Sequence, residues 1–297
     1  MSIFRGKLPY PHFSAFLTNL NDAIARAAEL IAQADGLLVT AGAGMGVDSG
    51  LPDFRGEGGF WKHYPALGRS GIGFTAIACP DAFRNDPRLA WGFYGHRLRL
   101  YRETTPHEGF QILRRWAKGM AHGLFAFTSN VDGQFPKAGF SHNQIMEAHG
   151  SIHHLQCLDG CREEIGSADD FDPVVDEENC LLLNDPPTCP HCGSSARPNV
   201  LMFGDWDWQS SRADSQRAAL DGWRKWVFQI AVIEIGAGTD IPTVRNFGEL
   251  IGEPLIRINP NEPGVHKNGI ISLRMGGLDA LRKIDEAFNG LRAARQL

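Results

Sequence analysis

The sequence predicts an α/β fold in which a parallel sheet carries helices on both faces, with a small zinc-binding module and a helical insertion added to it. Residues 19–34 have helical periodicity, and an apolar run at 36–40 and a glycine-rich loop follow them. Five of the six cysteines lie between Cys157 and Cys192, and in a chain of this size such clustering indicates a metal site before disulfides. Further short apolar runs, typical of buried parallel strands, are residues 124–129, 199–203, 229–235 and 255–259. Together these patterns predict a Rossmann-like sheet.

Composition and charge exclude several other classes of protein. The chain has 297 residues, of which 43% are apolar and 21% charged, as in an ordinary globular protein. A net charge of −5 gives no reason to expect nucleic acid as a partner. The first residues lack a signal-peptide core, and no run of about 18 apolar residues occurs. We therefore expect a cytoplasmic protein with no membrane partner, and the oligomeric state stays open.

The glycine-rich loop covers residues 41–56 and reads AGAGMGVDSGLPDFRG. Glycines allow the backbone to approach a diphosphate closely. The dehydrogenase fingerprint G-x-G-x-x-G fails, because Val47 stands where its third glycine would fall. A glycine turn used only for packing is the alternative for this segment taken alone.

The Pro-Asp-Phe-Arg that ends this loop resembles the sirtuin family, whose loop has the form GAGxSxxxGIPDFR. The matching residues are Gly42, Ala43, Gly44, Gly50, Pro52, Asp53, Phe54 and Arg55. Gly46 departs from the family's Ser, which removes a hydroxyl that contacts phosphate. The resemblance implies NAD as co-substrate, bound by Gly42, Ala43, Gly44 and Asp53. It also implies that Phe54 lies over the nicotinamide ribose and that Arg55 steers the cofactor loop.

Two further segments resemble the family. Residues 128–139 (TSNVDGQFPKAG) resemble the family's TQNIDxLH block, and residues 147–150 (EAHG) resemble its ExHG block. The resemblance implies that Asn130 and Asp132 bind the nicotinamide end of NAD and its nearby water. Ser129 replaces the family's Gln near the ribose and is expected to bind NAD at that position, and Gln134-Phe135 replaces Leu-His.

The chemistry of NAD-dependent deacylation explains these residue types. Cleavage of the nicotinamide–ribose bond produces an oxocarbenium-like centre, which the amide oxygen of an acyl-lysine attacks. A base must then remove a proton from a ribose hydroxyl, and histidine suits this step because its pKa lies near working pH. His149 is our candidate base. The alternative for His149 is a structural histidine in the core or at the surface, with its hydrogen bonds made within the protein. The alternative for Asp132 is a residue that only stabilises a turn.

Four of the cysteines form a C-x₃-C pair and a C-x₂-C pair. The proposed zinc ligands are Cys157, Cys161, Cys189 and Cys192. Four thiolates close the coordination sphere, so the Zn²⁺ is expected to be structural and not catalytic. Four unrelated buried cysteines are the alternative. Cys180 is expected to be an ordinary core or loop thiol.

The second half of the chain matches the family more loosely. Residues 197–205 (RPNVLMFGD) resemble the RPxVVxFGE strand, which implies that Phe203 and Gly204 border an edge that pairs with the substrate peptide. Residues at the position of the family's Gly-Thr-Ser, and an Asn that ends a strand, are expected on the adenosine side of NAD. They are Gly236, Gly238, Thr239 and Asn259.

Tyr94 and Arg97 lie three residues apart in a helical segment and therefore on one helix face. A phenol and a guanidinium on one face can grip a carboxylate. The pair resembles the Tyr-x-x-Arg of sirtuins that remove succinyl, malonyl or glutaryl groups. The alternative is an amphipathic helix in which Tyr94 packs and Arg97 is solvated.

The resemblance therefore implies one catalytic unit over residues 1–297, an NAD-dependent protein-lysine deacylase acting on acylated protein or peptide. An NAD glycohydrolase or ADP-ribosyltransferase, a non-catalytic NAD-binding module and a dehydrogenase are the alternatives. The Rossmann-like domain is expected at 20–57, 119–150 and 198–285, the cofactor loop and helical insertion at 58–118, and the zinc module at 151–197.

Overall fold

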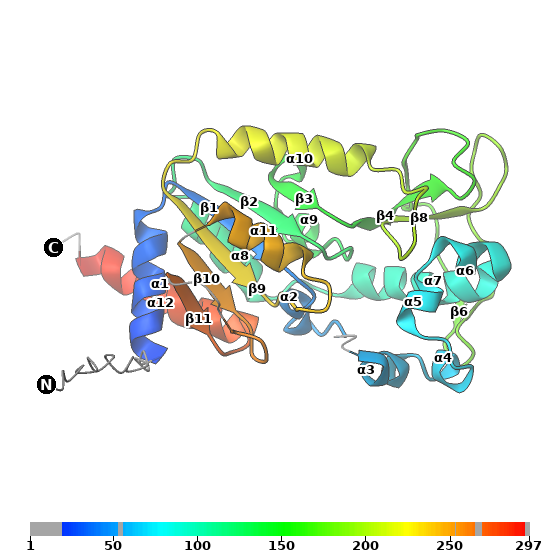
Figure 1. The fold of residues 1–297 in the computed structure, drawn as a ribbon, viewed down its shortest axis with the longest axis horizontal. Coiled ribbons are helices and arrows are strands. Elements are labelled where there is room, and N and C mark those ends of the chain that lie inside the picture. Colours follow the sequence, from blue (N-terminus) through cyan, green and yellow to red (C-terminus); the bar gives the residue numbers. More distant parts are fainter. Residues whose placement is uncertain (1–19, 53–55, 253, 265–268, 295–297) are drawn as a thin grey trace, which may run out of the picture.

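The computed structural model describes residues 20–52, 56–252, 254–264 and 269–294. Its centre is a six-stranded parallel sheet with the strand order β11-β10-β9-β1-β2-β3 (Figure 1). The strands are β1 Gly36–Ala41, β2 Leu124–Thr128, β3 Ile145–Glu147, β9 Ile230–Ile235, β10 Leu255–Ile258 and β11 Ile270–Leu273. The predicted α/β fold with a parallel sheet is confirmed.

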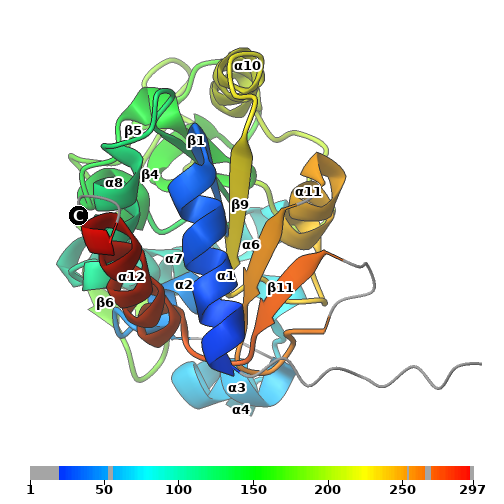
Figure 2. The same ribbon diagram turned by 90° about the vertical axis from the view of Figure 1, so that its left-hand side faces the viewer.

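Helices cover both faces of this sheet. One face packs against α1 (Leu20–Gln33), α8 (Glu108–Ala117) and α12 (Gly277–Ala294). Figure 2 shows α1 and α12 side by side over the sheet. The buried residues of α1 recur at helical spacing, so the helix turns one apolar stripe to the core: they are Ala23, Ile24, Ala27, Ala28 and Ile31. The other face packs against α10 (Ser211–Arg224) and α11 (Thr243–Ile251).

A second, mostly helical layer follows the glycine loop. It contains short helices and the long α7 (Pro87–Glu103), which Asp86 caps by accepting a hydrogen bond from the Leu89 backbone N–H at 3.0 Å. The short helices here and elsewhere are α2 Gly44–Val47, α3 Gly56–His63, α4 Pro65–Arg69, α5 Phe74–Ile77, α6 Pro80–Asn85, α9 Gln134–Lys137 and the 3₁₀ turn η1 His142–Gln144. Aromatic side chains of α6 and α7 fill a core separate from that of the sheet.

The segment after β3 forms a small antiparallel sheet of β5, β4 and β8. The strands are β4 Gly150–Cys157, β5 Gly166–Ser167 and β8 Ala196–Val200, and the separate hairpin consists of β6 Val175–Asp176 and β7 Leu181–Leu182. The prediction of a parallel strand at 199–203 is wrong. The strand ends at Val200, and it pairs antiparallel with β4, opposite Gly150.

The other predicted elements are α1, β1, β2, β9 and β10, each within two residues of its predicted bounds. The strands β3 and β11, which have three and four residues, were not predicted from the sequence. Three residues, as in β3, are too few to show a pattern, whereas length does not explain why β11 was missed, because the equally short β10 was found. Within the described residues, no helix is both long and apolar enough to cross a bilayer.

Candidate functional site

A cavity of about 930 Å³ opens where the carboxyl ends of β1, β2 and β9 face α7. In the sheet, β2 and β3 lie on one side of β1, whereas β9, β10 and β11 lie on its other side, so the strand order reverses between β1 and β9. Parallel sheets commonly bind ligands at such a reversal of strand order. Predicted site residues that line this cavity are Gly42, Ala43, Tyr94, Arg97, Ser129, Asn130, Asp132, His149, Phe203, Gly236 and Gly238.

The two glycine loops that form one wall touch each other. The Gly44 N–H donates to the Gly236 carbonyl at 3.1 Å. A Cβ on Gly44 would lie 2.7 Å from the Gly236 Cα, and Gly236 has a φ of +62°, which favours glycine. Close packing therefore explains Gly44 and Gly236, whereas Gly42 both packs there and lines the cavity.

The loop after β2 is tied to the first glycine loop. The Asn130 Nδ2 donates to the Gly42 carbonyl at 2.9 Å, and the Asn130 backbone N–H donates to Thr128 Oγ1 at 3.0 Å. Asp132 Oδ1 accepts from the Gln134 N–H at 2.9 Å, which is the turn role that had been the alternative for this residue. Asp132 nevertheless lines the cavity as well, and burial raises its pKa to about 6.

His149 lies between β3 and β4, next to a glycine that the fold requires. Gly150 has a φ of +75°, and a Cβ there would meet the Asn199 carbonyl at 2.1 Å. The His149 Nε2 lies 3.1 Å from the hydroxyl of Thr243, at the start of α11. Burial lowers the pKa of His149, so its imidazole is neutral near pH 7 and able to accept a proton.

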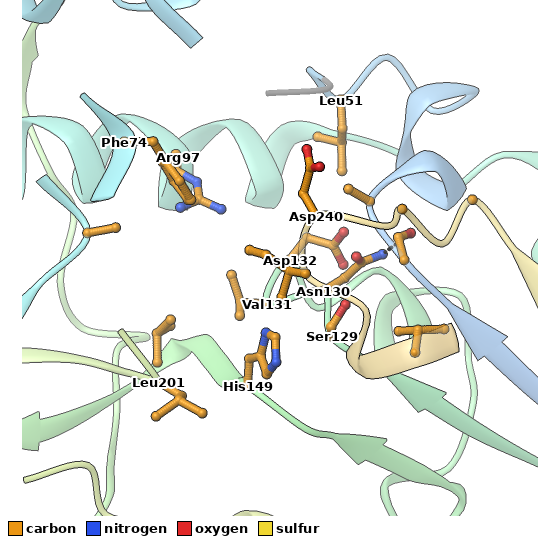
Figure 3. Close-up of a pocket in the computed structure, with 18 of the residues that line it drawn as sticks. Leu51, Phe74, Arg97, Ser129, Asn130, Val131, Asp132, His149, Leu201 and Asp240 are labelled. Atoms are coloured by element: carbon orange, nitrogen blue, oxygen red, sulfur yellow. Dashed lines mark hydrogen bonds between the residues drawn. The ribbon is translucent and has the colours of Figure 1, made fainter. Parts of the chain in front are cut away.

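Tyr94 and Arg97 of α7 both line the cavity. Figure 3 shows the Arg97 side chain projecting from its helix towards the pocket. In this view Arg97 lies across the pocket from Ser129 and Asn130, with His149 below and between them. The alternative with a solvated Arg97 is wrong, because the side chain is only 8% exposed. Its Nε and Nη2 donate to the Tyr101 hydroxyl at 3.0 and 2.8 Å.

The segment after β8 forms a further wall. A fully buried ion pair holds it, with the Arg197 Nη2 2.8 Å from Asp205 Oδ1. Phe203 lines the cavity, but Gly204 does not. The backbone N–H groups of Leu201 and Phe203 already donate to the carbonyls of His149 and Ala78, both at 2.9 Å. These two donors are therefore engaged within the chain, and the pairing of a substrate peptide here stays a prediction.

Thr239 and Asn259 are not among the residues that line the cavity, although Gly238 and Asp240 on either side of Thr239 are. The Thr239 hydroxyl donates to the Glu262 carboxylate. The Asn259 Nδ2 donates to the Ala237 carbonyl at 2.8 Å and is fully buried, so it fixes the loop after β9. Asp53, Phe54 and Arg55 lie outside the described residues.

Several residues of the site were not predicted from the sequence. Tyr101 stands one helical turn after Arg97, and that spacing was a usable signal. Asp240 and Thr243 follow shortly after the predicted Thr239, and Glu262 follows Asn259, but no motif marked these three residues themselves.

The four predicted zinc ligands lie together at one end of the small sheet. Their Sγ atoms are all within 4.8 Å of one another, with Cys157 3.6 Å from Cys192 and Cys161 3.5 Å from Cys189. Zinc–sulfur bonds of about 2.3 Å in a tetrahedron need similar sulfur–sulfur distances, so the residues fit Zn²⁺. Four thiol donors and a location away from the cavity suit a structural ion. Cys180 is buried and lies outside the cluster, as expected.

Comparison with known proteins identifies the family. The Sir2 family profile matches residues 42–218, which include both glycine-loop and histidine blocks as well as all four clustered cysteines. The chain belongs to the Sir2 family. This confirms the resemblance to sirtuins.

Named Sir2 relatives are similar over different lengths. A protein of Thermococcus sibiricus named "NAD-dependent protein deacylase" is 33% identical over 61% of this chain and 65% of its own length. A Thermus thermophilus protein of the same name is 26% identical over 88% of this chain and 93% of its own. The chain thus spans slightly less than two thirds of the first of these Sir2 relatives.

Solved Sir2 structures share the fold. The structure of a Sir2 homologue with NAD has a TM-score of 0.65 and 25% identity, and covers 91% of this chain and 94% of that one. A complex of a Sir2 homologue mutant with ADP-ribose has a TM-score of 0.64 and 26% identity, and covers 92% of this chain and 98% of that one.

Proposed function

We propose that this chain is an NAD-dependent protein-lysine deacylase that releases nicotinamide and O-acyl-ADP-ribose. The proposal rests on one observation, a single cavity that is lined at one end by the glycine loops and at the other by the buried side chains of Tyr94 and Arg97. Asn130, Asp132 and the neutral His149 line the same cavity. The glycine loops suit the diphosphate of NAD, and the opposite end leaves room for an acyl-lysine. The names of relatives support the same activity.

The residues divide the reaction between them. Asn130 and Asp132 hold the nicotinamide end while the glycosidic bond breaks and the acyl oxygen attacks the ribose. His149 then removes a proton from a ribose hydroxyl, and the resulting alkoxide attacks the imidate carbon. Thr243 fixes the His149 ring through its hydrogen bond. Cys157, Cys161, Cys189 and Cys192 would hold a structural Zn²⁺ that stabilises the fold and takes no part in the chemistry.

The decisive experiment follows nicotinamide release from NAD with and without acyl-lysine peptides. Release that depends on the peptide, together with deacylated product, supports the deacylase. Equal release without peptide supports an NAD glycohydrolase instead. Ser129 is the observation that favours this second function. It lines the cavity where the family has Gln, so the side-chain amide that would hydrogen-bond near the ribose is missing.

The acid side of the pH profile reports on His149. Its pKa lies below the usual value because burial disfavours the imidazolium, so the active neutral form persists down to a lower pH. We expect kcat/KM for an acyl-lysine peptide to be constant above about pH 7 and to fall only in more acidic buffer. Asp132, with its pKa raised to about 6, titrates in the same region, so Asp132→Asn is measured in parallel. A profile that still rises between pH 7 and 8 would contradict a neutral His149.

The buried pair of Tyr94 and Arg97 predicts a preference for acidic acyl groups. Arg97→Met removes a cation from the cavity and keeps much of the side-chain volume. We expect a loss of about tenfold to a hundredfold in kcat/KM for succinyl-lysine peptides, because a hydrogen bond to a charged group is lost, and little change for acetyl-lysine peptides. Parallel kinetics on both peptides test this. Equal losses, or a wild-type preference for acetyl, would leave Arg97 a structural residue.

A further inference from the structure

Arg97 has a partner on its own helix that no motif of the family marked. Tyr101 follows it by one turn, and both side chains are buried and line the cavity. The guanidinium donates twice to one phenolic oxygen, from Nε at 3.0 Å and from Nη2 at 2.8 Å. Two donors from one planar group to a single acceptor define the plane of the guanidinium as well as its position.

The direction of these hydrogen bonds also determines whether the Tyr101 hydroxyl can donate to a ligand. An arginine has no acceptor, so the phenolic hydrogen of Tyr101 cannot be donated to Arg97. Burial raises the pKa of Tyr101, which keeps the hydroxyl protonated across the physiological range. The hydroxyl therefore accepts from Arg97 and remains a donor for another group.

The surroundings of Arg97 restrict it further. Its guanidinium carbon lies 5.2 Å from the centre of the Phe93 ring, 5.7 Å from that of Tyr94 and 5.4 Å from that of Tyr101. Aromatic faces attract a cation without neutralising its charge. The charge of Arg97 is thus kept at the cavity wall in one orientation, and preorganisation of this kind strengthens binding by reducing the side-chain ordering needed when a ligand arrives.

We propose that Tyr101 is a specificity-determining residue that positions Arg97 and, together with Tyr94, forms a three-residue receptor for the carboxylate of a dicarboxylic acyl-lysine. This inference rests on the proposed deacylase function. Arg97 supplies the charge, Tyr94 and Tyr101 supply hydroxyl donors, and the Tyr101 oxygen holds the guanidinium in place. A neutral acyl group such as acetyl has no carboxylate and does not use the receptor.

The test compares Tyr101→Phe with wild type on succinyl-lysine and acetyl-lysine versions of one peptide. Removing only the hydroxyl should raise KM for the succinyl peptide about tenfold or more, with kcat nearly unchanged, and should leave the acetyl kinetics within about twofold. Binding of both peptides, measured calorimetrically in the presence of ADP-ribose, should show the same selective loss. The control is Thr104→Val, which removes a hydroxyl at the end of the same helix, bonded to the Leu100 carbonyl at 2.7 Å and outside the cavity lining, and which should leave the kinetics of both peptides unchanged.

A double-mutant cycle separates positioning from mere packing. If Tyr101 acts largely through Arg97, Tyr101→Phe should cost much less succinyl affinity in an Arg97→Met background than in wild type. Equal losses for both peptides in Tyr101→Phe, or the same succinyl loss in both backgrounds, would overturn the inference. A wild-type enzyme that releases nicotinamide but deacylates neither peptide would instead refute the proposed function itself.

Discussion

The variant His149→Ala should lose about a hundredfold to ten-thousandfold of its acyl-peptide turnover, the range typical of a missing general base. The structure gives the reason, because the neutral His149 ring lines the cavity and is oriented by Thr243 at 3.1 Å. Alanine leaves the glycine loops and the Asn130–Gly42 hydrogen bond untouched. Affinity for NAD should therefore change little, and calorimetric titration of NAD into the variant measures this directly.

The matched control for this variant is His142→Ala, which removes an exposed histidine of η1 outside the cavity lining. It should keep wild-type turnover. Near-normal deacylation by His149→Ala would exclude His149 as the base, whereas loss of NAD binding in that variant would mean that the residue holds the cleft together.

Loss of one zinc ligand should have the largest effect on stability. In Cys161→Ser a hydroxyl replaces a thiolate in a cluster whose four Sγ atoms lie within 4.8 Å of one another. Structural zinc contributes about 10–16 kcal/mol in small domains, against a total stability of about 5–15 kcal/mol for typical proteins. The segment around the cluster has only two-residue strands of its own besides β4 and β8, so it depends on the metal.

We therefore expect Cys161→Ser to unfold or aggregate, and chelation of the wild type to lower its melting temperature. Metal content by mass spectrometry and thermal melts measure both effects. Cys180→Ala is the control, because it removes a buried thiol outside the cluster and should leave one zinc per chain. A metal-free protein of full stability would refute the zinc assignment.

Local sequence patterns predicted much of the fold. For the site they predicted many of the lining residues but not the partners that hold those residues in place. Strongly apolar runs such as β1 and β9 were found because burial on both faces of a parallel sheet leaves a continuous apolar signal. The run at 199–203 gave the same signal but belongs to the antiparallel pair with β4, since composition does not reveal which partner a strand finds. The division into three domain segments stays a prediction.

The partners of the site residues were the harder part. His149 and Arg97 stood out in the sequence, but Thr243 lies 94 residues from His149, and only the fold brings the two together. The burial of Arg97 was likewise invisible, because a helix with arginine on one face suggests a solvated side chain until the aromatic residues around it are placed.

The contact between Gly44 and Gly236 has a consequence for how the protein can vary. Each residue occupies the space in which the other's side chain would stand, and neither can become smaller. A side chain added at one position therefore cannot be compensated by a smaller residue at the other, because both residues are already glycine. The loops that follow β1 and β9 can therefore stay in contact only while both positions are glycine.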